Sequence, residues 1–283
     1  MAEVKDTRRG PKPGSGPKND RDPRQGRGAY IDVSDGALIP EKGEKPALSA
    51  WRISFFGALA LLIILPIVRK DPYLAILEFI PDGVLRTLEV TILSIFFSFF
   101  VGLITGLGRI SRIAIINRIA TVYVEIIRGI PLLVQIFYIY YALGRFIRVP
   151  DIVAAVIAMT VCYGAYLGEI FRAGIQSIHK GQMEAAIALG LTRGQAMMRI
   201  ILPQTVKVVL PPLGNEFIAL LKDSSLVSIL AVSDLLRRGR EYASKTFYYF
   251  EAFTIVALVY LVMTLFFSRM VGVMEERLNR RGR

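Results

Sequence analysis

Residues 90–108 read VTILSIFFSFFVGLITGLG and contain no charged side chain. A helix needs about 20 apolar residues to cross the hydrocarbon core of a bilayer, so this stretch predicts a membrane-spanning helix. The rest of the chain agrees, because 53% of its 283 residues are hydrophobic and only 20% are charged, and its mean hydropathy is +0.48. This composition excludes a disordered protein, a coiled coil and an ordinary soluble enzyme.

Six apolar runs follow one another along the chain, at 53–68, 87–108, 119–143, 152–171, 203–221 and 252–268. Continuous apolar runs are typical of membrane helices, whereas alternating ones are typical of membrane strands. We therefore predict an all-α integral membrane protein with about six transmembrane helices. The fifth run contains Pro203, Pro211, Pro212 and Gly214, and we expect it to be a broken helix.

The first fifty residues are polar, rich in proline and glycine, and carry charges of both signs. Such a segment cannot bury enough apolar surface to fold, so we predict a disordered cytoplasmic tail at 1–50 that binds no nucleic acid. We expect an additional first transmembrane helix and an external link at 51–83. A transmembrane domain at 84–278 and a basic cytoplasmic C-terminus at 279–283 complete the predicted organisation.

The formal net charge of +12 bears on orientation, because cytoplasmic links of membrane proteins are rich in lysine and arginine. The basic links 109–118 and 172–202 and the basic tail after 268 fall on one side if there are six spans. We therefore expect both termini to be cytoplasmic. Arg237, Arg238 and Arg240 conflict with this scheme, since they fall on the outer side.

The second apolar run carries small residues at every fourth position: Ser94, Ser98, Gly102 and Gly106. Residues four apart share one face of a helix, and small residues let another helix approach closely in lipid. Packing within the bundle and packing against another subunit would both use such a face. We favour packing within the bundle.

The single cysteine, Cys162, and the single histidine, His179, exclude an internal disulfide and a cysteine-based metal cage. We predict no metal site and no catalytic site, and we expect Cys162 to be buried in a span and His179 to lie at the surface. A membrane-embedded enzyme would lack a catalytic cluster. A secondary transporter would show two broken helices in matching positions, and the sequence predicts only one.

The link between the fourth and fifth runs, 181–204, reads GQMEAAIALGLTRGQAMMRIILPQ. We predict a first short helix at Gln182–Leu189, closed by Gly190, because glycine adopts the left-handed conformation that follows a helix at little cost. Thr192 and Gln195 form a capping box that begins a second helix, and Pro203 begins the next span.

The first of these helices exposes little side chain, because it contains Ala185, Ala186 and Ala188. Glu184 lies in its first turn, where a carboxylate interacts favourably with the helix dipole. A helix of this kind could enter a groove on a partner protein or lie at the membrane surface. Composition does not distinguish these two alternatives.

Seven residues at fixed offsets in this link resemble the EAA loop of ABC importer permeases: Glu184, Ala185, Ala186, Gly190, Ile200, Leu202 and Pro203. Further stretches are similar to the polar amino-acid (histidine/glutamine/arginine permease) type within that class. They are Tyr123 to Glu125, Arg128 to Gln135, Tyr166, Glu169 to Arg172, Lys180 to Gln182, and Leu221 to Leu226. The resemblance covers roughly residues 82–278, with mild departures at Ile130 and Ser224, where the family usually has threonine.

This resemblance implies that the loop 181–203, including Gln182, docks on a separate ATPase subunit and couples ATP hydrolysis to movement of the spans. It also implies a bacterial inner membrane, a polar amino-acid substrate, an extracytoplasmic solute-binding protein, and a second permease subunit that is either a copy or a paralogue. The chain has no Gly-x-x-x-x-Gly-Lys-Ser/Thr run for nucleotide phosphates. We therefore expect ATP and magnesium on the partner and no cofactor on this chain.

Charged residues inside spans are costly and are candidates for function. Glu125 and Arg128 are three residues apart, as are Glu169 and Arg172, so each pair shares a helix face and can form an ion pair. One interpretation assigns Glu125, Arg128 and Glu169 to the substrate pathway. In it Glu125 contacts the ammonium group or the side chain of an amino acid, and Arg128 contacts its carboxylate. The alternative is that both pairs are structural.

The fifth run adds Asn215, Glu216 and Lys222 as candidates for the pathway. Asn215 and Glu216 follow the prolines, where irregular backbone is tolerated if it lines a cavity. They could contact the ammonium group or the side chain of the solute, and Lys222 could contact the carboxylate. Alternatively, Glu216 pairs with Lys222, which could also mark the outer end of the span.

Overall fold

The computed structural model describes residues 49–147 and 149–280. Within these ranges the chain forms helices and turns but no strand, which confirms the all-α prediction. The predicted tail 1–50 lies outside the described residues except for its last two positions. The predicted C-terminus 279–283 also lies outside them, except for its first two positions. The predicted domain boundaries therefore remain predictions.

Eleven α-helices are described within these ranges. They are α1 (Ala50–Val68), α2 (Lys70–Phe79), α3 (Pro81–Arg109), α4 (Ala114–Gly129), α5 (Leu132–Phe146), α6 (Asp151–Gln176), α7 (Lys180–Ala188), α8 (Arg193–Ala196), α9 (Leu202–Asp223), α10 (Leu235–Thr246) and α11 (Tyr249–Arg280). A π-helical turn, η1 (Met197–Ile201), precedes α9, and a 3₁₀ helix, η2 (Ser224–Ile229), follows it. Four of the helices, α1, α3, α6 and α11, are long and apolar enough to cross a membrane, and α4 with α5 adds a fifth span if the pair counts as one.

The predicted break in the fifth apolar run is wrong. This run lies in α9, which is helical from Leu202 to Asp223 and includes Pro211 and Pro212 in its interior. Proline is tolerated inside membrane helices where neighbouring groups satisfy the backbone. The polar residues and prolines of α9 explain why it is not among the four helices that are long and apolar enough to cross a membrane.

The break lies in the third apolar run instead, where α4 and α5 meet at 107°. Pro131 causes it, because a residue that precedes proline is disfavoured in the helical conformation, and Ile130 is extended with φ −109° and ψ 131°. The amide Nε2 of Gln135 donates to the carbonyl oxygens of Ile127 and Ile130, both at 2.7 Å. Gln135 therefore satisfies carbonyl groups at the bend and holds the two helices at their angle.

The small-residue face of α3 packs against α6 of the same chain. A Cβ added to Gly102 would lie 2.5 Å from Cβ of Leu167, and one added to Gly106 would lie 2.7 Å from Cβ of Phe171. Ser94 and the other members of the face are buried. The favoured prediction of packing within the bundle is confirmed.

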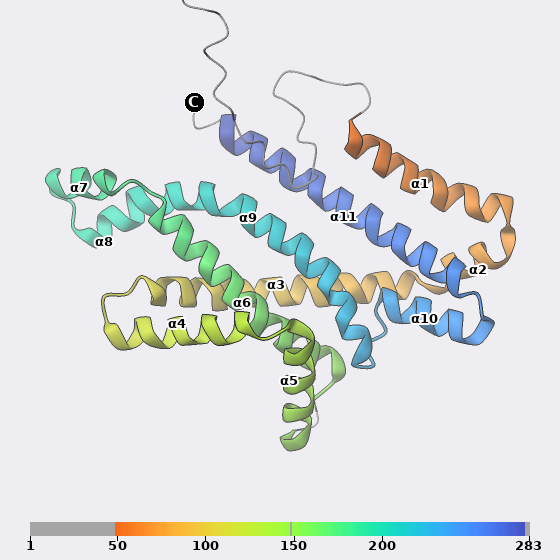
Figure 1. Ribbon diagram of the computed structural model, residues 1–283. Coiled ribbons are helices and arrows are strands. Elements are labelled where there is room, and N and C mark those ends of the chain that lie inside the picture. Colours follow the sequence, from red (N-terminus) through yellow and green to blue (C-terminus); the bar gives the residue numbers. More distant parts are fainter. Residues whose placement is uncertain (1–48, 148, 281–283) are drawn as a thin grey trace, which may run out of the picture. The chain divides into compact units, whose positions relative to one another are not determined.

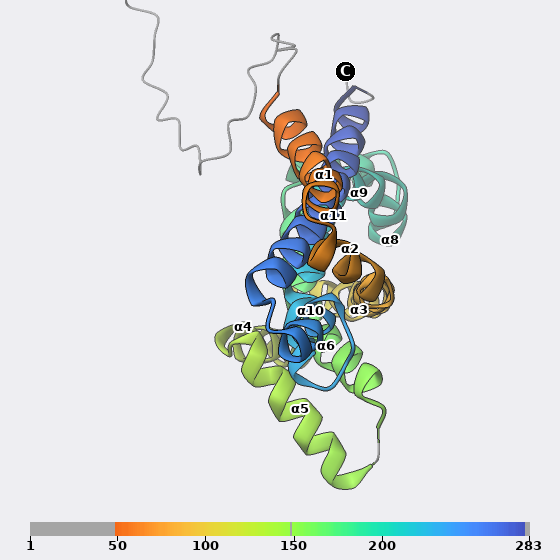
Figure 2. The same ribbon diagram turned by 90° about the vertical axis from the view of Figure 1, so that its right-hand side faces the viewer.

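The main hydrophobic core lies around α6 and includes the buried side chains of Met159, Cys162, Leu220 and Val227. Cys162 is buried, as predicted. Figure 1 shows α9 and α11 side by side, with α1 along α11. The helices α7 and α8 lie at one end of this arrangement and α10 at the other, and both views show α5 projecting away from the other helices (Figures 1 and 2).

Candidate functional site

The predicted turn between the two helices of the loop 181–203 is present. α7 begins at His179, whose Nδ1 accepts a hydrogen bond from the N–H of Gly181 at 3.1 Å. At its other end Gly190 has φ +87°. The N–H of Gly190 donates to the carbonyl of Ile187 at 2.9 Å, and the N–H of Leu191 donates to the carbonyl of Ala186 at 3.1 Å. These two bonds form a Schellman motif, which requires the left-handed residue that glycine supplies.

The predicted capping box is also present and begins α8. The backbone N–H of Gln195 donates to the hydroxyl of Thr192 at 3.3 Å, and the N–H of Thr192 donates to Oε1 of Gln195 at 2.9 Å. From α8 the chain continues without interruption through the π-helical turn, where the N–H of Leu202 donates to the carbonyl of Met197. A displacement of this loop would therefore pass directly into α9.

The loop presents an exposed surface with few large polar groups. Gln182, Glu184 and Ala185 are exposed, and Leu189 is 83% exposed. Ala186 is buried, so it holds α7 in place. Of the remaining predicted residues, Ile200 and Leu202 are half-buried, and Pro203 is exposed at the start of α9. A partner groove and a membrane surface both remain compatible with this exposure.

Three arginines from three helices converge on one carboxylate, that of Glu169 in α6. Arg172 is one turn away on the same helix and contacts it through Nε at 3.2 Å and Nη2 at 2.9 Å, which confirms the predicted pair. Arg109, at the end of α3, also forms an ion pair with Glu169. Arg128, at the end of α4, lies 4.0 Å from it.

The predicted ion pair between Glu125 and Arg128 is absent among the described residues. The guanidinium of Arg128 instead lies over the ring of Tyr166, 5.2 Å from its centroid, and points toward Glu169. These contacts come from α6 and cannot be inferred from spacing along α4. Glu125 is exposed. The side chain of Arg128 is 45% exposed, against 17% for Arg109 and 30% for Arg172, so Arg128 is the least enclosed of the three arginines.

One of the candidates on α9, Glu216, lies near the same groups. Glu216 is half-buried and within electrostatic range of Arg128 and Asp223. Asp223 accepts a hydrogen bond from the hydroxyl of Tyr163 at 2.8 Å. Asn215 and Lys222 are exposed, and no ion pair joins Glu216 to Lys222 in the described part of the chain.

Polar side chains of α6 thus form a row that connects these groups. Tyr163, Tyr166, Glu169 and Arg172 are spaced three residues apart, so each is a neighbour of the next on the helix surface. At about 3.6 residues per turn, the row winds about halfway around α6 from Tyr163 to Arg172. We call these four residues the α6 row. The sequence did not lead us to Tyr163 or to a role for Tyr166, although the spacing of three residues from Glu169 indicates that both belong with it. It also missed Arg109, because only tertiary structure brings that residue to Glu169.

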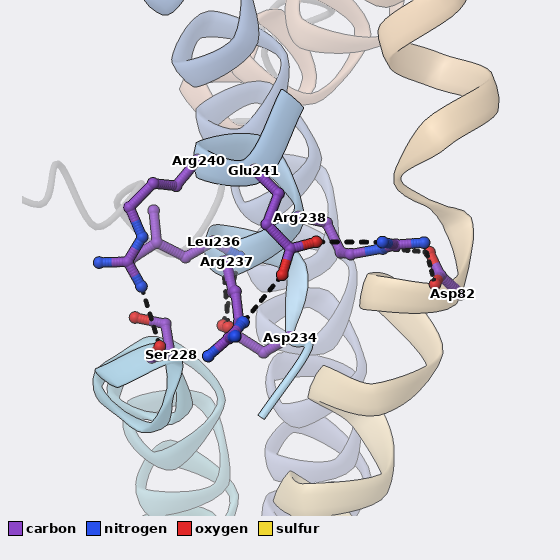
Figure 3. Close-up of polar contacts among 8 residues, drawn as sticks. All are labelled: Asp82, Ser228, Asp234, Leu236, Arg237, Arg238, Arg240 and Glu241. Atoms are coloured by element: carbon purple, nitrogen blue, oxygen red, sulfur yellow. Dashed lines mark hydrogen bonds and ion pairs between the residues drawn. The ribbon is translucent and has the colours of Figure 1, made fainter. Parts of the chain in front are cut away.

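A second polar cluster surrounds α10 (Figure 3), at the end of the bundle far from α7 and α8 (Figure 1). Arg237 bonds Glu241 at 2.9 Å, and Arg238 bonds Asp82 of α3 at 3.0 Å. Arg240 donates to the backbone carbonyl of Ser228 at 2.9 Å. The arginines that conflicted with the charge rule therefore belong to a folded helix, not to a loop.

Comparison with known proteins identifies the family. The family described as binding-protein-dependent transport system inner membrane component matches residues 94–280. The probable glutamine ABC transporter permease protein GlnM of Bacillus subtilis is 40% identical over 70% of this chain and 93% of that protein. The glutamine transport system permease protein GlnP of Escherichia coli is 38% identical over 70% of this chain and 91% of that protein.

Solved structures lead to the same result. A structure described as an amino acid ABC transporter with histidines has a TM-score of 0.69 and 41% identity, and covers 75% of this chain and 97% of that chain. The resemblance to ABC importer permeases is thereby confirmed, and such a chain is a transport component, not an enzyme. The chain belongs to the family of inner membrane components of binding-protein-dependent transport systems.

Proposed function

We propose that this chain is the membrane-spanning permease subunit of an importer for polar amino acids, driven by ATP hydrolysis on a separate subunit. The relatives named for glutamine transport and the solved amino-acid transporter support this substrate class. The observation that carries the proposal is the exposed guanidinium of Arg128 beside the α6 row. Charged side chains at membrane depth face a cavity or another protein chain, since exposure to lipid is costly.

The chemistry of an amino acid matches these groups. Its carboxylate needs a guanidinium with unused donors, and Arg128 offers them because its contact with Glu169 is long, at 4.0 Å. Its ammonium group needs a carboxylate, and Glu216 lies within electrostatic range of both Arg128 and the second carboxylate, Asp223. Asn215, Glu125 and Lys222 are exposed and complete the polar lining.

A second permease subunit would close this pathway. α5 projects from the bundle (Figure 2) and exposes Tyr138 and Tyr141, next to Arg145. Hollows of about 440 and 600 Å³ adjoin Tyr141 and Arg145. Between Val90 and Leu107 the exposed positions of α3 are aliphatic or phenylalanine, for example Ile92, Phe96 and Ile104. Tyrosine hydroxyls and a guanidinium suit protein or water better than lipid tails. The second subunit is either a copy of this chain or a paralogue.

The loop 181–203 is proposed to dock on the ATPase subunit, which binds ATP and magnesium. The exposed, small surface of α7 suits a groove on that partner, and the continuous helix from α8 into α9 would transmit its movement. This assignment places the loop and both termini in the cytoplasm of a bacterial cell, with α10 on the outer side of the inner membrane. Cysteine substitutions at Ser177 and Ser244 in a Cys162→Ser background should accordingly be labelled from opposite sides.

The test is uptake of a panel of labelled amino acids into vesicles that contain the permease, its ATPase subunit and its solute-binding protein. Arg128→Gln removes the charge and should weaken uptake of the preferred amino acid at least tenfold. The solute concentration that gives half-maximal uptake should rise. Arg112→Gln changes an exposed arginine in the α3–α4 link and is the matched control. An unchanged solute dependence with a lowered melting temperature would instead assign Arg128 to structure.

A further inference from the structure

The amphipathic helix α10 has one face that packs on the protein and another that remains free. Leu235, Gly239 and Ala243 are buried on the inner face. Gly239 allows close approach to α11, since a Cβ there would lie 2.4 Å from Cγ2 of Val256. The outer face contains Arg237, Arg240, Glu241, Ser244 and Lys245, of which Arg240, Ser244 and Lys245 are exposed.

The carboxylates around α10 are already engaged within the chain. Asp234 is buried and caps the helix by accepting from the N–H groups of Leu236 and Arg237 at 3.2 and 3.1 Å. Glu241 bonds both Arg237 and Arg238 (Figure 3). The outer face therefore carries a surplus of positive charge.

That surplus lies on two exposed side chains. Arg240 contacts the backbone carbonyl of Ser228, and Lys245 lies 5.6 Å from the ring centroid of Phe79. Neither forms an ion pair of 4 Å or less with a carboxylate in the described part of the chain. Both charges are thus available to an outside partner.

α10 is also a rigid platform. The N–H of Leu235 donates to the hydroxyl of Thr87 in α3 at 3.0 Å, and Arg238 connects the helix to Asp82 at the start of α3. The guanidinium of Arg238 lies 4.4 Å from the ring centroid of Phe79 in α2. A surface whose side chains are fixed before binding loses less conformational entropy when a partner docks.

The position of α10 indicates which partner can reach it. The 22 residues of α9 span about 33 Å at 1.5 Å per residue, and they separate the loop 181–203 from η2 and α10. If that loop faces the ATPase in the cytoplasm, α10 faces the side from which solute arrives. The family depends on a solute-binding protein, which must meet the permease on that side.

We propose that the outer face of α10, through Arg240 and Lys245, is a docking surface for acidic side chains of the solute-binding protein. This inference rests on the proposed function, which fixes the orientation of the chain. Complementary charge across an interface accelerates encounter and selects the correct partner, and its effect declines as salt is added. The same surface would disfavour binding proteins that present a basic face.

The experiment measures binding of the cognate solute-binding protein to the complete transporter in nanodiscs, at 50 mM and at 500 mM salt. The double variant Arg240→Glu/Lys245→Glu should weaken binding at least tenfold at low salt and about threefold or less at high salt. ATPase activity without the binding protein should not change. Arg240→Lys should bind as the wild type does, and Arg118→Glu, an exposed residue of α4, is the control for charge reversal elsewhere.

Two results would overturn the inference. The first is wild-type affinity in the double variant, and the second is a loss of affinity that is equal at both salt concentrations. Wild-type affinity in a double variant that no longer responds to anionic lipid in the nanodisc would assign the face to lipid headgroups. If the double charge reversal lowers the melting temperature, the neutral variant Arg240→Gln/Lys245→Gln replaces it in the binding experiment. We expect its loss of affinity to be intermediate. If the wild type bound no solute-binding protein at all, the proposed function itself would fail.

Discussion

Replacing Gly190 with alanine tests whether the turn between α7 and α8 couples this subunit to its ATPase. Gly190 has φ +87°, in the left-handed region that costs an L-residue about 1–2 kcal/mol. No atom lies within 4 Å of the position that its Cβ would occupy, so the backbone alone bears the cost. That cost corresponds to a factor of about 5–30 in an equilibrium. We expect the affinity for the ATPase subunit to fall by this factor, and uptake to fall with it.

The assay is binding of the purified ATPase subunit to the permease in nanodiscs, together with uptake in vesicles. Gly190→Asn is the matched variant, because asparagine adopts the left-handed conformation more readily than alanine, and it should retain most of the affinity. Gly194→Ala is the control, since this glycine lies in α8 with open space around it. Equal affinity and uptake for the alanine and asparagine variants at Gly190 would refute the reasoning.

Three further predictions concern stability. Glu169→Gln leaves three arginines without their shared carboxylate and should lower stability by about 3 kcal/mol, whereas an unchanged melting temperature would show that the cluster is dispensable. Gly106→Ala should cost about 1–3 kcal/mol by overpacking the α3–α6 contact, while Gly57→Ala, with open space around it, should be neutral in the same melting experiment. Burial raises the pKa of Asp234 from 3.8 to about 6, so the folded state binds the proton more tightly than the unfolded state does. The resulting stabilisation is present below pH 3.8 and is lost as the pH rises through 6. The melting temperature of the wild type relative to that of Asp234→Asn should therefore fall between pH 4 and pH 7. A difference in melting temperature that stays constant over this range would contradict the prediction.

Local sequence was sufficient to predict the helical runs and the turn of the loop 181–203. The turn depends on Gly190, Thr192 and Gln195, whose preferences act over four residues or fewer. The position of the bend was harder to predict, because prolines occur in both the third and the fifth runs. Pro131 bends its helix where Gln135, four residues later, satisfies carbonyl groups at the bend. At Pro131 the side chain of Gln135 thus replaces the donor that proline lacks.

The polar contacts were harder to predict because their partners are distant in sequence. Spacing gave the pair of Glu169 and Arg172 correctly, since both lie on one helix. The same spacing failed for Arg128, because the ring of Tyr166 and the carboxylate of Glu169 lie on another helix. Arg238 and Asp82 are separated by 156 positions, and no local pattern connects them.

The additional helix α1 precedes the residues that the family matches, and its attachment bears on topology. The indole Nε1 of Trp51 donates to the carbonyl of Leu265 in α11 at 2.9 Å, and Arg69 forms an ion pair of 3.2 Å with Glu251. The start of α1 thus lies beside the later part of α11, and the end of α1 beside its beginning. The two helices are antiparallel, so the chain enters α1 at the same end of the bundle at which it leaves α11. A helix placed in this way starts at the end of the bundle where α11 ends and leaves the direction of the helices that follow unchanged.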